Sequence, residues 1–330
     1  MSFDPAGQAS RLSSDRMSLL TKIARMYHEQ GLRQPEIADR LHISQSRVSR
    51  FLKEAVAIGV VRTIVIAPSG VYPDLEDAIR DRYGLTDVVV AEPANDQESS
   101  IISALGTAGA AYLETTLSPS DRVGISSWSS TLIATVDAMI PRTVRRADSV
   151  VQVLGGVGNP TVQVQATRLA DRLARVTGAS PRFLAAPGVV ASAELREALL
   201  QDEYISQVAD AWRTLTVLLV GVGSLQPSPL LKDSGNVVSL EEMEALRTSG
   251  AVGDVCLRFF DANGDLVDSP LNGRVLGISV DELRAVPRKV AIAGGPRKHQ
   301  AIRAALEGGW IDVLITDVAT AEYLVGVTPA

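Results

Sequence analysis

Residues 34–61 read QPEIADRLHISQSRVSRFLKEAVAIGVV, and this stretch decides the fold of the first part of the chain. The segment PEIADRL places Pro35 in a first helical turn, where its missing N–H costs nothing, and predicts a short helix. The chain then turns at His42, which stands where such turns usually have glycine but tolerates left-handed backbone. Ser44 follows as a cap for a second helix that ends near Gly59. The stretch therefore predicts two helices joined by a tight turn.

An amphipathic helix precedes this stretch. Leu20, Ile23 and Tyr27 recur at helical spacing, which predicts a helix over residues 15–29. Three short helices with a tight turn and a capped third helix are typical of a helix-turn-helix. The strand-like run VVRTIVI at 60–66 follows as a candidate wing.

The third helix separates an apolar face from a polar one. Val48, Phe51 and Leu52 fall on one side, and hydroxyl, amide and cationic side chains fall on the other. Polar groups near the start of such a helix read base edges, and cations bind phosphates. On an isolated helix a solvated surface would look the same, but the neighbouring helices and the turn favour DNA. The candidate DNA-contacting residues are Gln34, Ser44, Gln45, Ser46, Arg47, Ser49, Arg50 and Lys53.

Composition and charge predict two domains of different character. The chain has 330 residues, of which 46% are apolar and 21% charged, enough for two compact cores. Residues 10–66 carry ten basic and five acidic groups, whereas residues 67–330 carry a net charge of −10. A basic end on an acidic body suits a protein that touches phosphate backbone with one part only. The expected segments are a disordered tail over 1–14, a helix-turn-helix domain over 15–66, a linker over 67–73, and an effector-binding and oligomerisation domain over 74–330.

Several classes of protein are disfavoured by the composition. The chain has no run of about 18 apolar residues and no apolar centre near its start, so a soluble cytoplasmic protein is expected. The single cysteine, Cys256, precludes an internal disulfide, and three scattered histidines make a zinc site improbable. We expect no metal and no cofactor.

Beyond residue 73 the sequence alternates apolar strands with amphipathic helices. Fully apolar strands bounded by glycine predict a mainly parallel sheet covered on both faces, a Rossmann-like α/β domain. The expected strands are 87–92, 122–126, 149–154, 182–186, 216–223, 254–261, 274–278, 289–294 and 313–317. The expected helices are 74–84, 98–117, 129–140, 163–177, 192–200, 240–249 and 298–307.

The loops after these strands are consistently small or polar. Ligands of parallel sheets bind beyond the carboxyl ends of the strands. Small residues there let N–H groups approach an anion, a lysine adds charge, and an aspartate accepts hydrogen bonds from sugar hydroxyls. Plainer roles stay open, since the glycines can make tight turns, Ser129 can cap a helix and Lys298 can be solvated. The candidate effector-binding residues are Ser126, Ser129, Ser130, Thr131, Gly155, Gly156, Gly221, Gly223, Asp254 and Lys298.

Taken together, the motifs resemble the SorC-type family of sugar-responsive transcription regulators. Residues 34–61 and the motifs VGISSWSSTL, VVQVLGGVG, SGAVGDVCLRFFDANG and VAIAGGPRKHQAIRAALEGG occur in the family's order, and the matches run over nearly the whole chain from about residue 17. The resemblance implies a winged or homeodomain-like helix-turn-helix and an effector domain related to ribose-phosphate isomerase and glucosamine-phosphate deaminase. It also implies homotetramers on paired operator half-sites.

The resemblance assigns effector contacts to the serine-rich loop, the Gly155-Gly156 turn, Asp254 and Lys298. One feature departs from the family's pattern, because SSWSST carries Ser129 where the family usually has glycine. That departure predicts an effector of different size or an unphosphorylated polyol.

Two functions are compatible with these features. The first is a DNA-binding regulator of carbohydrate catabolism, with operator DNA, a sugar-phosphate or polyol effector and further copies of the chain as partners, and no membrane. The alternative is a sugar-phosphate isomerase or deaminase fused to a helix-turn-helix. Such an enzyme needs a tuned general base. Asp254 and Asp317 are the carboxylate candidates, and His299 is the one histidine in a strand-end loop. We therefore expect no enzyme activity and assign no catalytic residue.

Overall fold

The computed structural model describes residues 14–62, 68–126, 129–141, 144–156, 160–226 and 238–326, without the side chains of 14 and 160–166. The chain divides into two compact units, residues 1–67 and 68–330. Each unit has its own hydrophobic core.

The first unit is a helix-turn-helix built from α2 (Ser14–His28), α3 (Gln34–Leu41) and α4 (Gln45–Ala57). Its small core is made by apolar side chains of all three helices, among them Ile23, Ile37 and Val48, each fully buried. His42 has φ 50° and ψ 45°, so the left-handed turn predicted between the second and third helices is confirmed. Most of the candidate wing lies outside the described residues.

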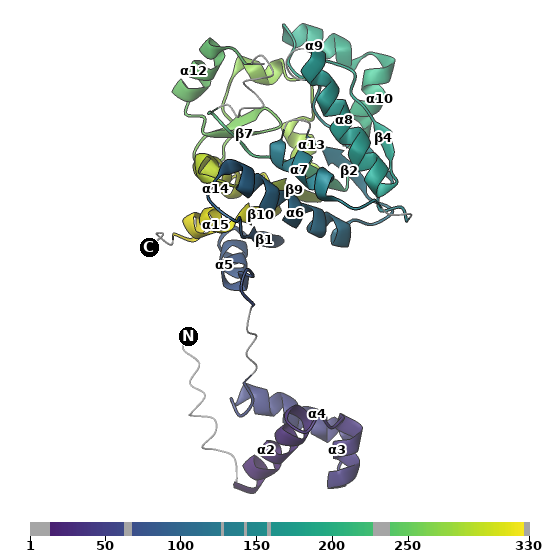
Figure 1. The fold of residues 1–330 in the computed structure, drawn as a ribbon, viewed down its shortest axis with the longest axis vertical. Helices are drawn as coiled ribbons and strands as arrows, with labels where there is room; N and C mark the ends of the chain where they lie inside the picture. Colours follow the sequence, from purple (N-terminus) through teal and green to yellow (C-terminus); the bar gives the residue numbers. More distant parts are fainter. Residues whose placement is uncertain are drawn as a thin grey trace. The chain divides into compact units, whose positions relative to one another are not determined.

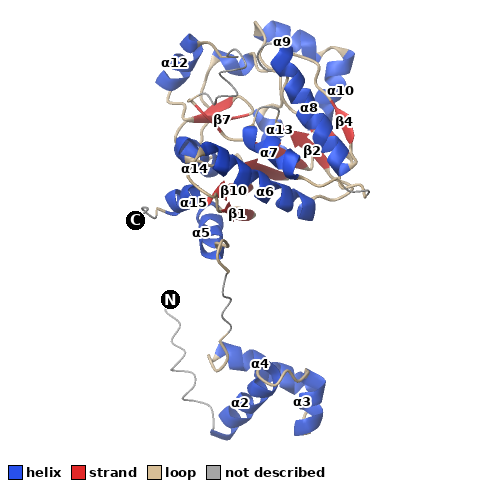
Figure 2. Cartoon of the chain, in the orientation of Figure 1, coloured by secondary structure: helices blue, strands red, loops and turns tan. Residues whose placement is uncertain are grey.

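The second unit is an α/β domain around a parallel sheet of seven strands, as predicted (Figures 1 and 2). The strand order is β1-β10-β9-β5-β2-β3-β4, and every neighbouring pair is parallel. The strands are β1 (Asp87–Ala91), β2 (Arg122–Ile125), β3 (Ser149–Gln152), β4 (Ser180–Arg182), β5 (Val217–Val220), β9 (Arg288–Ile292) and β10 (Val313–Asp317).

Helices cover both faces of this sheet. Alternate residues of the central strand β5 enter two different cores: Val217 joins one and Leu218 the other, and both are buried. Burial on both faces is the reason that the strand is continuously apolar. One core packs against α6 (Glu98–Thr116), α7 (Ser130–Ala138) and α8 (Pro160–Thr177). The other packs against α5 (Pro73–Tyr83), α10 (Glu203–Trp212), α13 (Val280–Ala285), α14 (His299–Glu307) and α15 (Val318–Val325).

A second, three-stranded antiparallel sheet differs from the prediction. The expected strand over 254–261 is wrong, because the chain reverses at Cys256 and Leu257, whose φ values are 54° and 60°. Two consecutive residues with positive φ form the turn of a two-residue hairpin, which is usually made by glycine or asparagine. The strands of this sheet are β6 (Gly223–Ser224), β7 (Gly253–Val255) and β8 (Arg258–Phe260), and α9 (Ala193–Leu200), α12 (Leu240–Thr248), η1 (Pro270–Gly273) and η2 (Pro296–Lys298) complete the described elements.

Other differences concern short elements. The expected strand over 274–278 makes only isolated bridges, from Val275 to Val189 and from Gly277 to Leu154. The expected strand over 182–186 is β4, which begins and ends earlier. The helices α10, α13 and α15 were not predicted, because each is ten residues or shorter and gives few helical repeats to detect.

Candidate functional site

The first candidate site is the exposed face of α4. The Ser44 hydroxyl accepts a hydrogen bond from the Arg47 amide at 3.3 Å and caps the helix. Val48, Phe51 and Leu52 are buried, so the polar side chains point away from the core of the unit. This face combines cations with hydrogen-bonding groups that could contact DNA. Among the predicted residues, Ser44, Gln45, Ser46, Arg47, Arg50 and Lys53 are exposed, and Gln34 and Ser49 are half-buried.

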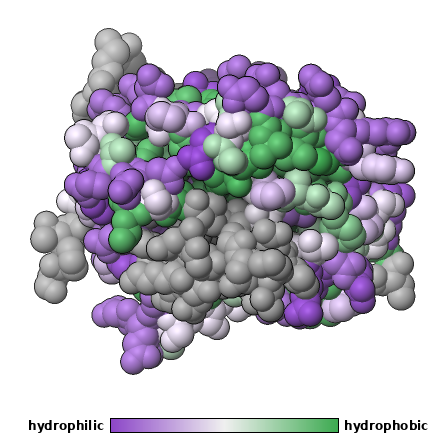
Figure 3. Space-filling model, turned by 90° about the horizontal axis from the view of Figure 1, so that it is seen from above, coloured by the Kyte–Doolittle hydropathy of each residue, from purple (hydrophilic) through white to green (hydrophobic). Residues whose placement is uncertain are grey.

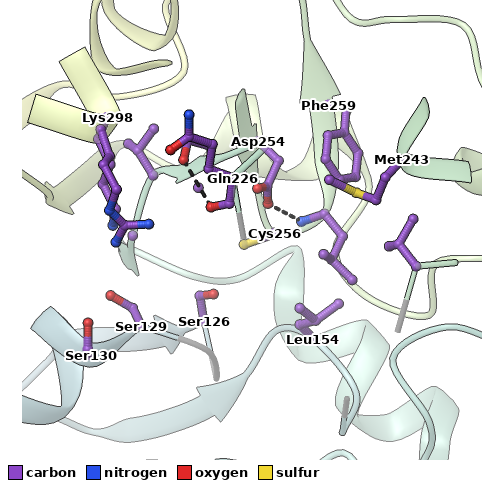
Figure 4. A pocket seen from close by; sticks show the side chains of 17 residues that line it. Ser126, Ser129, Ser130, Leu154, Gln226, Met243, Asp254, Cys256, Phe259 and Lys298 are labelled. Carbon is purple, nitrogen blue, oxygen red and sulfur yellow. Dashed lines mark hydrogen bonds between the residues drawn. The ribbon is translucent and has the colours of Figure 1, made fainter. Parts of the chain in front are cut away.

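The second candidate site is a pocket in the α/β unit at the carboxyl ends of β2 and β5. One wall is the serine-rich loop between β2 and α7, and the other is formed by the small antiparallel sheet and α12. Figure 4 shows the serine side chains facing Asp254, Cys256 and Lys298 across the pocket. The predicted effector residues that line it are Ser126, Ser129, Ser130, Gly221, Gly223, Asp254 and Lys298.

The serine-rich loop is held by hydrogen bonds at the start of α7. The Ser129 hydroxyl accepts from the Leu132 amide at 3.3 Å and lies 2.8 Å from the Thr131 hydroxyl. Thr131 donates in turn to the Ile292 carbonyl at 2.6 Å, which ties the loop to β9. Thr131 lines a neighbouring cavity that also includes Ser130 and Lys298. Ser129 is thus both a helix cap and a wall of the pocket.

Two glycines give side chains room to enter the pocket. A Cβ atom at Gly223 would lie 1.9 Å from Asp254 Oδ1, and one at Gly221 would lie 2.7 Å from Ser129 Oγ. A side chain at either position would displace the polar group opposite. The glycines therefore act by admitting Asp254 and Ser129.

Asp254 holds an enclosed carboxyl group. Its Oδ2 accepts a hydrogen bond from the Leu257 amide at 3.0 Å across the hairpin turn. Burial raises the pKa of Asp254 to about 6, while that hydrogen bond and the charge of Lys298 act in the opposite direction. Burial likewise raises the pKa of the neighbouring Cys256 thiol to about 12, so this thiol is protonated and unreactive at neutral pH.

Lys298 supplies the opposite charge. Burial lowers the pKa of its amine, and the carboxylate of Asp254 counteracts that change. In the part of the chain that the structure describes, the Lys298 amine has no hydrogen-bonding partner, whereas the adjacent Arg297 is paired with Glu98. The pocket can therefore offer one acceptor of hydroxyl protons, one cation for an anionic group and several hydroxyls.

A family comparison fits this geometry. The profile of the family described as "Putative sugar-binding domain" matches residues 72–326. The chain is similar to the deoxyribonucleoside regulator of Bacillus subtilis strain 168, with 32% identity over 95% of this chain and 99% of that protein. It is also similar to the sorbitol operon regulator of Klebsiella pneumoniae, with 30% identity over 94% of this chain and 99% of that protein. The chain belongs to the SorC-type family of sugar-binding transcriptional regulators.

The structural comparison extends the SorC-type likeness to nearly the whole chain. The crystal structure of the full-length sorbitol operon regulator SorC from Klebsiella pneumoniae superposes with a TM-score of 0.72 and 29% identity. The match covers 94% of this chain and all of that one. A helix-turn-helix followed by a parallel α/β domain is therefore the architecture of this SorC-type chain.

Two predicted residues of the family motif lie apart from the pocket lining. The Gly155 amide donates to the Leu276 carbonyl and the Gly156 amide to the Ala186 carbonyl, at 3.0 and 2.8 Å. A Cβ at Gly155 would lie 2.6 Å from the carbonyl oxygens of Ala186 and Pro187. These amides are used in packing two chain segments together and are not directed at a ligand.

Sequence reasoning missed the apolar wall of the pocket. Met243 from α12, Phe259 from β8, Val238 and Leu154 line it beside the polar groups. Apolar side chains give no local signal of a binding role, because they look like any other core residue. Only the glycines in the loop before β6 and the polar residues at the strand ends could be recognised from the sequence as candidates for binding.

The described residues also lack two kinds of feature. They contain no cluster of three or more histidine, cysteine or acidic side chains that could hold a metal ion. Within the same ranges, no helix has the length and apolar character needed to cross a membrane.

Proposed function

We propose that this chain is a transcription regulator whose binding to operator DNA is controlled by a small sugar phosphate or polyol. Its helix-turn-helix domain over 15–66 reads the operator, and its domain over 74–330 binds the effector after a linker over 67–73. The observation that carries the proposal is that Asp254 and Lys298 line one pocket opposite three serines, close enough for each charge to shift the pKa of the other.

The chemistry of the pocket indicates the class of effector. A carboxylate and hydroxyls in an enclosed site suit a molecule with several hydroxyl groups, since each buried polar group needs a partner. The Lys298 amine, which makes no hydrogen bond to the described residues, suits a phosphate or another anionic group on the same molecule. A phosphorylated sugar or polyol satisfies both, and an unphosphorylated polyol satisfies only the first.

The enzyme alternative has weaker support. Asp317 caps α15, with Oδ1 accepting from the Thr320 amide at 3.0 Å and Oδ2 from the Gly295 amide at 2.7 Å. The His299 ring stacks on Tyr323 at 4.4 Å and does not line the pocket. Of the three candidate bases, Asp254 borders the pocket, and the described residues that line it include no second acid or histidine to share proton transfer.

We further propose that the chain works as a homo-oligomer, a dimer or tetramer on paired half-sites. Figure 3 shows apolar surface bordered by hydrophilic side chains on one face. Among the large apolar side chains of the α/β unit, Tyr204 and Leu240 are 77% and 80% exposed. Effector binding would favour one arrangement of subunits and so set the spacing of the recognition helices.

A thermal-shift screen tests the effector proposal. The purified chain is heated with phosphorylated and unphosphorylated sugars and polyols, because a ligand that binds only the folded state raises Tm. We expect a sugar phosphate or polyol to raise Tm without being consumed over hours at the same concentration. Turnover of that ligand would replace the regulator with the enzyme alternative, and the absence of any hit would remove the effector site from the proposal.

A further inference from the structure

The side of α4 that faces α2 carries charged residues in addition to those of its exposed polar face. A cleft between α2 and α4 is lined by three arginines, Arg16, Arg47 and Arg50, together with Asp15 and Glu54. Arg16 was not among the predicted DNA-contacting residues, and it belongs to the first helix. The cleft therefore extends the basic surface beyond α4.

Two guanidinium groups converge on one aromatic ring in this cleft. The guanidinium carbons of Arg16 and Arg47 lie 5.9 and 5.7 Å from the centre of the Phe51 ring. Each position is within the range of a cation–π contact, which fixes the direction of a long side chain. The ring thus brings a cation from α2 and a cation from α4 to the same place.

An acidic residue of α4 holds the cation of α2 in the cleft. Arg16 Nη2 lies 3.0 Å from Glu54 Oε2, with 51% of the arginine side chain and 21% of the glutamate side chain exposed. Arg47 stands in the first turn of α4, where a cation opposes the helix dipole. An anion between Arg16 and Arg47 would offset the unfavourable position of Arg47 in the helix dipole and the repulsion between the two guanidinium groups. A DNA phosphate is the anion that a recognition helix meets.

We propose that Arg16 is a DNA-backbone contact and that the cleft between α2 and α4 holds a phosphate of the bound duplex. Glu54 orients Arg16 in the free protein and competes with the phosphate for it. The proposal rests on the proposed function, since it needs the helix-turn-helix to bind DNA. The proposal predicts that removal of Glu54, the acidic ion-pair partner of Arg16, strengthens DNA binding.

The test measures binding of the full chain to a fluorescent random-sequence duplex of about 30 base pairs as a function of salt concentration, since phosphate contacts do not depend on sequence. Arg16→Ala should weaken binding about tenfold at low salt and reduce the slope of log affinity against log salt by about 1. Glu54→Gln should strengthen binding about threefold, because the competitor is lost.

Arg25→Ala is the matched control. Arg25 lies on the same helix and pairs with Glu29 at 2.8 Å, in an ion pair whose acidic partner is more exposed than Glu54. It is nine residues from Arg16, which places it about 180° around the helix at about 100° per residue. Its removal should leave both affinity and salt slope close to those of the unsubstituted chain.

The outcomes separate this proposal from the one on which it rests. If the unsubstituted chain fails to bind the duplex at low salt, the proposed DNA-binding function fails. If it binds, but Arg16→Ala keeps the salt slope and Glu54→Gln weakens binding, the ion pair is only a structural tie between α2 and α4 and the phosphate site is overturned. Arg16→Lys guards against misfolding, because it keeps the charge and should retain the slope.

Discussion

The polar face of α4 and the pocket of the α/β unit hold charge in opposite ways. On α4 the cations stand exposed on one continuous helix, on a face set by helical periodicity. In the pocket Asp254 and Lys298 come from segments 44 residues apart and lie enclosed between two sheets. Exposed charge acts at a distance and is screened by salt, whereas buried charge acts through the cost of removing water. The effects of substitutions on α4 should therefore depend on salt concentration, whereas those in the pocket should appear in stability and its dependence on pH.

The largest expected effect concerns a buried cation of the α/β unit, Arg258, which is not among the described residues that line the pocket. Arg258 donates to the carbonyls of Asn272, Gly277 and Ile278, and burial lowers its pKa to about 10. Arg258→Ala would leave these carbonyls without a donor, and we expect a loss of about 3 to 5 kcal/mol in the free energy of unfolding. Urea unfolding followed by tryptophan fluorescence measures it, because every tryptophan lies beyond residue 67.

Arg303→Ala provides the exposed counterpart in the same unit. Arg303 pairs with Glu307 at 3.0 Å and is 51% exposed, so its removal should change the free energy of unfolding far less than Arg258→Ala does. A similar loss for Arg258→Ala and Arg303→Ala would contradict the contrast between buried and exposed cations.

The next effect is the pH dependence of Asp254. Its pKa is about 6 in the folded chain and about 3.8 in the unfolded chain, so between these values the folded chain binds more protons. The group therefore stabilises the fold most below about pH 4, and its contribution is lost as the pH rises to 6. The change is on the order of 3 kcal/mol at 1.36 kcal/mol per pKa unit.

Asp254→Asn isolates this contribution. The amide oxygen can still accept from the Leu257 amide, but nothing titrates at that position. The difference in unfolding free energy between the unsubstituted chain and the variant should fall as the pH rises from 4 to 7. A difference that stays constant over this range would show that Asp254 titrates normally and that its enclosure has no electrostatic cost.

Sequence reasoning predicted the two regions unequally, for a physical reason. Ser44 and His42 were recognised because a helix cap and a left-handed turn are local, and their signals lie within a few residues. The hairpin at Cys256 and Leu257 was missed because an apolar pair occupies a turn that usually needs glycine. A side-chain hydrogen bond supports the turn in place of glycine: the carboxylate of Asp254, three residues earlier, accepts from the Leu257 amide, and an aspartate at that position is no general signal of a hairpin.

The prediction of the pocket from the sequence depended on one general rule. The rule that ligands bind beyond the carboxyl ends of parallel strands predicted Ser126, Gly221 and Lys298 as effector contacts, and all three line the pocket. The rule does not say which strand ends meet, so Gly155 was included although its amide bonds the Leu276 carbonyl. The apolar wall depends on how α12 and the small sheet pack, and no local pattern encodes that.

A smaller effect is expected from the removal of the pocket's cation. Lys298→Met keeps the volume of the side chain and removes its charge. For a phosphorylated effector found by the thermal-shift screen, we expect Kd to rise about 10- to 100-fold, the value of a charge-assisted hydrogen bond. For an unphosphorylated polyol the change should stay below about threefold.

The same variant sharpens the account of Asp254. The positive charge of Lys298 lowers the pKa of that carboxyl, so its loss should move the pH-dependent change in stability to higher pH.

Equal losses of affinity for phosphorylated and unphosphorylated ligands in Lys298→Met would assign Lys298 to shaping the pocket and would remove the phosphate subsite.

The smallest effect lies on the recognition helix. Arg50 is exposed on the polar face of α4, so Arg50→Ala removes one screened charge and leaves the core of the unit untouched. We expect affinity for a random-sequence duplex to fall about fivefold at low salt, with a salt slope smaller by about 1, and the effect should fade as salt rises. The rise in Tm caused by the effector should be unchanged, because the pocket belongs to the other unit. An undiminished affinity would remove Arg50 from the DNA-binding surface, whereas a loss that persists at high salt would mean that Arg50 reads a base and not a phosphate, because a base contact is less sensitive to counterions.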